Sequence, residues 1–257
     1  MLPLIIPVAR SSANGVRTLS IMVNDERFKP PVADKADAAH AIARSGLGAI
    51  PWAGTAAVEL LAAIVTPSLE KRRTEWMEEV GTALRKLESE MGLILENLQK
   101  NEAFIDAALE ASQIAAKTSS SEKRQALRNA ILHSALPDPP EESMQKMFLS
   151  FIDTLTTWHI KLLYLFNDPP GFFQKNQINS PNVSMGAPAH MVEAAYPELR
   201  GRREIYDLVW KDLYSRALVS SDSLHVMMTG SGVIAKRTTV IGEQFIGFIQ
   251  SPFRDET

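Results

Sequence analysis

The chain has 257 residues, of which 45% are hydrophobic and 22% charged, and its formal net charge is −3. This composition is typical of a folded protein with a substantial core and not of a disordered chain. The slight negative charge gives no overall basic field for holding nucleic acid. The lack of cysteine excludes disulfides, thiolate nucleophiles and thiolate metal ligands.

The first 33 residues predict either a hairpin that turns at Asn14-Gly15 or a poorly ordered extension. Their apolar opening has no positively charged start, and Pro3 and Pro7 interrupt it, which is unlike a secretory signal. We therefore expect a cytoplasmic protein.

Residues 46–66 carry a single charge, Glu59, and are followed by a basic cluster. A stretch of this length is either a buried bundle helix or a segment that enters a lipid bilayer. Glu59 would cost about 2.5–3.5 kcal/mol at the centre of a membrane, and Pro51 leaves a helix of only about a dozen residues from Thr55. We therefore favour a bundle helix with Val65 facing inward. The residues that define this membrane or partner segment are Trp52, Val58, Leu61, Ile64, Lys71, Arg72 and Arg73.

A proline-free stretch between Pro67 and Pro137 predicts helices. Apolar residues recur within it every three or four positions, which predicts one long helix with a buried stripe. That stripe consists of Trp76, Val80, Leu84, Leu87, Met91, Leu95 and Leu98.

Four further helices are expected before residue 167. One covers residues 102–117 and buries Phe104, Ile105, Ala108 and Leu109. The next begins at a capping box of Ser119 with Glu122 and ends at Leu136. A third opens with Pro139 and Pro140 and buries Met144, Met147, Phe148, Phe151, Ile152 and Leu155. A short fourth helix covers residues 158–166 behind Thr156 or Thr157.

Residues 167–189 are rich in Asn, Gln, Pro and Ser and predict a long surface loop. An amphipathic helix follows over residues 205–218, with Ile205, Leu208, Val209, Leu213 and Leu218 on its apolar face. Residues 224–235 predict a two-stranded ribbon that turns at residues 229–232, and Thr239 should cap a final helix.

This order of helices and ribbon is that of a winged helix. The sequence thus predicts an all-α protein: a helical body at 34–166, the loop at 167–189, and a C-terminal winged-helix-like module at 190–257 containing a short two-stranded ribbon. If the module bound nucleic acid, its phosphate contacts would be Arg200, Arg202, Arg203, Lys236 and Arg237. The helix between these groups has nearly balanced charges and carries aromatic residues, which favours protein interaction over base reading.

Five segments of the C-terminal half occur in an order that resembles the bacterial Abi-alpha (abortive infection alpha) family. They are residues 127–132 (LRNAIL), 148–155 (FLSFIDTL), 158–163 (WHIKLL), 212–219 (DLYSRALV) and 238–245 (TTVIGEQF). The chain departs from the family pattern at Ala217, where a glycine is usual. The resemblance implies a helical protein with a degenerate winged-helix-like end and a role in anti-phage defence, and it supplies no catalytic residues.

No pattern of catalytic residues stands out in the sequence. The five histidines have no metal-ligand spacing, and residues 229–232 lack the lysine and helix of a phosphate-binding loop. We therefore expect no enzyme, no metal and no cofactor. The best-supported class is a non-enzymatic binding or effector protein that acts through a protein partner or self-association. The alternatives are a winged-helix nucleic-acid regulator and an effector that inserts residues 46–66 into a membrane.

Overall fold

The computed structural model describes residues 55–253. The chain divides into two compact units, residues 1–66 and 67–257. In the first unit the described residues, 55–66, form the start of helix α3.

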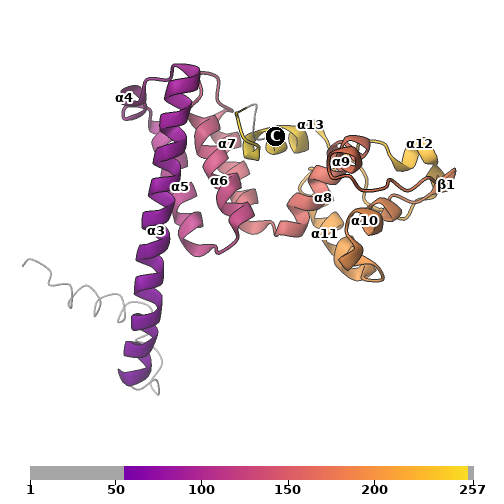
Figure 1. The fold of residues 1–257 in the computed structure, drawn as a ribbon, viewed down its shortest axis with the longest axis horizontal. Coiled ribbons are helices and arrows are strands. Elements are labelled where there is room, and N and C mark those ends of the chain that lie inside the picture. Colours follow the sequence, from indigo (N-terminus) through magenta and orange to yellow (C-terminus); the bar gives the residue numbers. More distant parts are fainter. Residues whose placement is uncertain (1–54, 254–257) are drawn as a thin grey trace, which may run out of the picture. The chain divides into compact units, whose positions relative to one another are not determined.

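The described part of the chain is mostly helical, with one small antiparallel sheet, which agrees with the predicted helical character (Figure 1). The elements, in chain order, are α3 (Thr55–Met91), α4 (Leu95–Leu98), α5 (Glu102–Lys117), α6 (Ser121–Ala135), α7 (Glu142–Thr154), α8 (Thr157–Asn167), α9 (Pro169–Lys175), β1 (Met185–Gly186), α10 (Ala189–Ala195), the 3-10 turn η2 (Pro197–Leu199), α11 (Arg203–Ser215), β2 (Met228–Thr229), α12 (Gly230–Val233) and α13 (Val240–Ile249).

Helix α3 joins the short helix predicted from Thr55 to the long helix predicted after Pro67, and it ends at Met91, before the end of the predicted stripe at Leu98. Pro67 lies inside the helix and does not bound it. At the other end Gly92 adopts a left-handed backbone (φ 67°), which stops the helix and places Leu95 and Leu98 on a separate element. The predicted stripe is therefore broken: Trp76 and Leu87 are buried, but Met91 is 47% exposed.

Helices α5, α6 and α7 pack against one another. Helix α5 has the predicted bounds, but its buried face is turned away from Leu109, which is 58% exposed; the buried residues are Ala107, Ala111, Ile114 and Ala115. Ser120, and not Ser119, caps α6 by accepting a hydrogen bond from the Lys123 N–H. Helix α7 begins at Glu142, after the two prolines that were expected to open it.

The predicted loop over residues 167–189 is wrong in part, because two elements lie within it. Asp168 accepts a hydrogen bond from the Gly171 N–H, and the prolines occupy the first turn of α9. Proline has no N–H to satisfy there, so Pro169-Pro170 begins a helix and does not prevent one. Further along, β1 provides one strand of the sheet.

The predicted hairpin at residues 224–235 is also wrong. Residues 230–233 wind into α12 behind the cap Thr229, so no return strand follows β2. Strand β2 pairs instead with β1, matching Met185 with Thr229 and Gly186 with Met228. By contrast, the predicted cap of the last helix is confirmed, because Thr239 Oγ1 accepts from the Gly242 N–H.

The main core gathers aromatic rings from α7, α8, α9, α11 and α13. Trp210 on α11 is 1% exposed and packs edge-on against Phe166, with ring centres 4.7 Å apart. Leu208 was expected on the apolar face of α11 but is 71% exposed, whereas Tyr206 is 2% exposed and Tyr214 is 45% exposed. Helix α13 contacts both α6 and α8, and α9 contacts α8.

Candidate functional site

A cleft of about 610 Å³ is lined by residues of α6, α8 and α9, by Tyr196, and by the end of α13 with the two residues after it. This volume lies within the range of pockets that hold small ligands or short segments of a partner. The lining residues come from four separate parts of the sequence, so their side chains meet only in the folded chain.

One wall of the cleft is aromatic. It includes Tyr164 of α8, Phe172 of α9 and Tyr196. Burial raises the pKa of Tyr164 to about 12, and no described residue pairs with its hydroxyl. Tyr196 Oη donates to the Lys161 carbonyl at 3.0 Å, and its ring lies edge-on to Phe172. The wall thus offers ring surface together with one free phenol.

The rest of the lining is rich in carboxamides, which both donate and accept hydrogen bonds. Gln125 and Asn129 lie one turn apart on α6, and Asn167, Asn176 and Gln250 belong to the other elements. Asn129 is 2% exposed and donates through Nδ2 to the Ile249 carbonyl at 2.9 Å. Its Oδ1 is buried without a hydrogen-bond partner. An unpaired acceptor of this kind is costly and marks a place where a donor is expected.

The charges that line the cleft balance. Glu122 and Asp168 are acidic, and Lys161 and Lys175 are basic. Hydrogen bonds from its own backbone N–H and from Ser120 lower the pKa of Glu122. The Lys161 ammonium lies 4.8 Å from the centre of the Trp158 ring, where the ring face attracts it. A neutral ligand, or one with balanced charges, suits such a lining.

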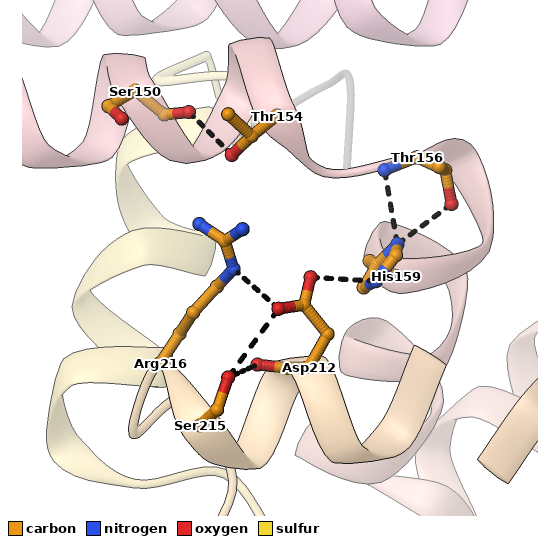
Figure 2. Close-up of polar contacts among 7 residues, drawn as sticks. All are labelled: Ser150, Thr154, Thr156, His159, Asp212, Ser215 and Arg216. Atoms are coloured by element: carbon orange, nitrogen blue, oxygen red, sulfur yellow. Dashed lines mark hydrogen bonds and ion pairs between the residues drawn. The ribbon is translucent and has the colours of Figure 1, made fainter. Parts of the chain in front are cut away.

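A second polar cluster joins α8 to α11 (Figure 2). His159 Nε2 lies 3.2 Å from Asp212 Oδ2, and Arg216 Nε lies 3.1 Å from Asp212 Oδ1. Both the N–H and the hydroxyl of Thr156 point at His159 Nδ1, at 3.1 and 2.7 Å. Since Nδ1 accepts from Thr156, the ring proton lies on Nε2, facing Asp212. The imidazole therefore caps α8 and ties it to α11, and the cap residue is Thr156, one of the two that the sequence offered.

The five predicted phosphate contacts have different surroundings. Arg203 pairs with Asp207 and Lys236 pairs with Glu243, at 3.0 and 2.7 Å. Arg202 is exposed, whereas Arg237 is only 9% exposed.

Two of these residues have structural contacts. Arg200 Nε donates to the Glu193 carbonyl at 3.0 Å. Arg237 Nη2 donates to the Gly232 carbonyl at 2.7 Å, so this guanidinium holds the turn after α12. Neither Lys236 nor Arg237 lies on a ribbon, because the predicted return strand does not form.

The predicted membrane or partner segment lies mostly outside the described residues. This applies to Trp52 and to the side chains of Val58, Leu61 and Ile64. Val65, which was expected to face inward, is 41% exposed. Of the basic residues, Lys71 and Arg73 are exposed and Arg72 is half-buried, and Lys71 Nζ lies 3.8 Å from Glu75. Within residues 55–253, no helix has both the length and the apolar character that crossing a membrane requires.

The cleft was not predicted from the sequence. One signal was present: Asn129 interrupts the apolar run of α6 that includes Ala126, Leu127, Ala130 and Ile131. A polar residue at a core position often meets a ligand or a partner group. The other lining residues are ordinary residues of helices, such as Ile160 and Tyr164 of α8, or belong to the segment that was interpreted as a loop.

No group of three histidine or carboxylate side chains that could hold a metal ion occurs within the described ranges. Comparisons of the chain with protein-family models, curated proteins and solved structures found no match.

Proposed function

We propose that this chain is a non-enzymatic binding protein and that the cleft beside α6 holds its ligand. The observation that carries the proposal is Asn129, whose buried Oδ1 has no donor although the residue lines an aromatic cleft. Leaving such an acceptor unpaired costs about 1–3 kcal/mol. A ligand that supplies an N–H or O–H group would recover that cost, while ring contacts with Tyr164 and Phe172 would bury its apolar part.

The proposal is tested by protein-observed NMR on the full chain, with a fragment library of neutral aromatic amides, nucleosides and monosaccharides as probes. We expect a set of fragments to shift the side-chain amide signals of Gln125 and Asn129. Tyr164→Ala should weaken these fragments, whereas Tyr214→Ala, at an exposed tyrosine of α11, should not. A library that leaves the cleft signals unmoved would overturn the proposal.

The biological role that we attach to this binding is a part in bacterial anti-phage defence, exerted in the cytoplasm through a protein partner or self-association. The sequence resemblance to Abi-alpha proteins supports it. The test is a plaque assay on a bacterial host with and without the chain, at low and high phage dose. We expect fewer plaques at low dose and collapse of the culture at high dose. Equal plaque counts across a phage panel would contradict the role.

The alternative of a winged-helix-like nucleic-acid binder at residues 190–257 draws on the exposed side chains of Arg200 and Arg202. Its test is salt-dependent binding to duplex DNA. The alternative of a membrane-active effector rests on residues 46–66, and liposome flotation and dye release test it. Wild-type protein that stays off the liposomes and releases no dye would remove that alternative.

A further inference from the structure

We infer that the cleft binds the main chain of an extended peptide segment from a protein partner. This inference rests on the proposed binding function and names the ligand class for the same site. It follows from the spacing of the amides on α6, from the mixture of free donors and acceptors, and from the charge balance of the lining.

The spacing of Gln125 and Asn129 matches the repeat of an extended chain. Residues four apart on a helix are separated by about 6 Å along its axis, because each residue rises about 1.5 Å. An extended chain repeats every two residues, or about 6.6 Å, and at each repeat an N–H and a C=O point to the same side. The two side-chain amides can therefore face successive peptide units on one edge of the segment.

Neither of these two amides is fully used within the described structure. Gln125 is exposed and has no hydrogen-bond partner among residues 55–253. Asn129 Oδ1 is free to accept an N–H, since only Nδ2 is engaged, with the Ile249 carbonyl. A peptide unit supplies the N–H that Asn129 lacks and offers a carbonyl to a neighbouring amide.

Two other lining residues, Asn167 and Asn176, supply complementary groups. Asn167 Oδ1 accepts from Thr238 Oγ1 at 2.9 Å, so its Nδ2 remains to donate. Asn176 Nδ2 donates to the Phe172 carbonyl at 2.8 Å, so its Oδ1 remains to accept. The free groups thus include both donors and acceptors, as a main chain requires.

The apolar lining of the cleft determines which side chain of the bound peptide fits beside its main chain. Ile160, Tyr164 and Phe172 offer apolar surface for one aromatic or aliphatic residue of the peptide. With two acidic and two basic residues around it, the cleft has no net field that would attract a phosphate backbone. A segment without net charge fits better than a nucleic acid.

The experiment selects random twelve-residue peptides by display on the immobilised full chain and measures the affinity of a synthetic peptide from the enriched set. We expect the set to share an aromatic or aliphatic position. Gln125→Ala should weaken the peptide roughly 3- to 10-fold, the size expected for one hydrogen bond. The matched control Gln113→Ala, at an exposed glutamine of α5, should leave the affinity unchanged.

N-methylation of the synthetic peptide, one position at a time, tests main-chain recognition directly. We expect the loss of affinity to alternate along the peptide, because only every second N–H faces α6. Losses without alternation, an affinity that ignores Gln125→Ala, or a selection that enriches nothing would each overturn the inference.

The fragment library separates failure of this inference from failure of the binding function. Nucleosides or monosaccharides that occupy the cleft when no peptide is enriched would leave the binding function standing and remove the peptide. A cleft that takes neither fragments nor peptides would remove both.

Discussion

The carboxylate of Asp212 on α11 contacts two side chains. Its Oδ2 lies 3.2 Å from His159 Nε2 on α8, and its Oδ1 lies 3.1 Å from Nε of Arg216, the residue after α11 (Figure 2). The Arg216 guanidinium in turn lies over the Phe151 ring of α7, 5.6 Å from its centre. One carboxylate therefore ties α7, α8 and α11 together. This link positions α8, which carries Tyr164 and Lys161 into the cleft.

Asp212→Ala should destabilise the protein by about 1–2 kcal/mol. Hydrogen bonds to charged groups contribute about 1.5–3 kcal/mol, and solvent screening of this carboxylate, 35% exposed, reduces that value. Asp222→Ala, at an exposed aspartate with no ion pair among the described residues, should stay within about 0.5 kcal/mol of wild type. Urea unfolding measures both. Equal midpoints for the two variants would contradict the role of Asp212.

The stability of the fold should fall on acidification through the histidine range. Burial lowers the pKa of His133 and His159 from the ordinary value of 6.5. Between the folded and unfolded pKa values the unfolded chain binds more protons than the folded chain, so the free energy of unfolding rises with pH. The stability that depends on neutral His133 and His159 is fully present above pH 6.5. It is lost as the pH falls below 6.5 toward the folded pKa values.

Unfolding free energies of wild type and His159→Gln, measured from about pH 7.5 to about pH 5.5, check this expectation. The variant lacks one of the two groups and should show a shallower dependence on pH. An identical slope would mean that the imidazole of His159 titrates alike in the folded and unfolded chains.

Leu87 and Met91 belong to the same predicted stripe but should respond differently to truncation. Leu87 is fully buried in a cluster with Leu98, Leu132 and Phe253, so Leu87→Ala should cost about 2–5 kcal/mol. Met91, at 47% exposed, has little apolar surface to lose, and Met91→Ala should cost under about 1 kcal/mol. Thermal unfolding distinguishes the two. A large loss for Met91→Ala would show that the stripe continues across the end of α3.

These cases indicate where sequence reasoning succeeds and where it fails. The apolar spacing predicted the long helix, and threonines before helices predicted the cap at Thr239 and offered Thr156 as one of two caps for α8. These features depend on neighbours a few residues away, so a local pattern can identify them. It failed at residues 167–189, where Pro169-Pro170 was interpreted as a break although Asp168 makes it a helix start. It also failed at residues 224–235, since the partner of β2 lies far upstream and no local pattern identifies it.

The cleft could not be predicted for a related physical reason. Gln125, Asn129 and Tyr164 are ordinary helix residues taken singly, and they come together because α13 packs against both α6 and α8. The free Oδ1 of Asn129 is a property of the folded chain, because it depends on what surrounds that atom.

Two glycines of α13 form a matched pair for testing its contact with the turn after α11. A Cβ on Gly242 would overlap the Leu218 carbonyl oxygen, whereas one on Gly247 would meet nothing within 4 Å. We expect Gly242→Ala to destabilise the protein by about 1–3 kcal/mol through the forced backbone shift. Gly247→Ala should instead stabilise it by about 0.5–1 kcal/mol, because alanine is the better helix former. Denaturant midpoints that move in the same direction would contradict this packing.

Arg237 was predicted as a phosphate contact, but its hydrogen bonds indicate that its guanidinium stabilises the fold. Its Nη2 donates to the Gly232 carbonyl, and its backbone N–H donates to the Phe166 carbonyl, so the residue links α12 to α8. Burial lowers the pKa of this guanidinium, although arginine at any ordinary pH stays charged. Arg237→Ala should therefore cost about 1–3 kcal/mol of stability, because the guanidinium contacts with the Gly232 carbonyl and Met228 Sδ are lost.

Arg202→Ala is the matched control, since this side chain is exposed and has no ion pair within residues 55–253. It should leave the midpoint of unfolding unchanged. In a fluorescence assay with duplex DNA we expect at most weak binding of the wild type that vanishes with salt, because most of the basic groups of residues 190–253 are paired or buried. Tight binding that Arg202→Ala removes without loss of stability would instead identify the C-terminal segment as a nucleic-acid reader and would displace the cleft as the principal site.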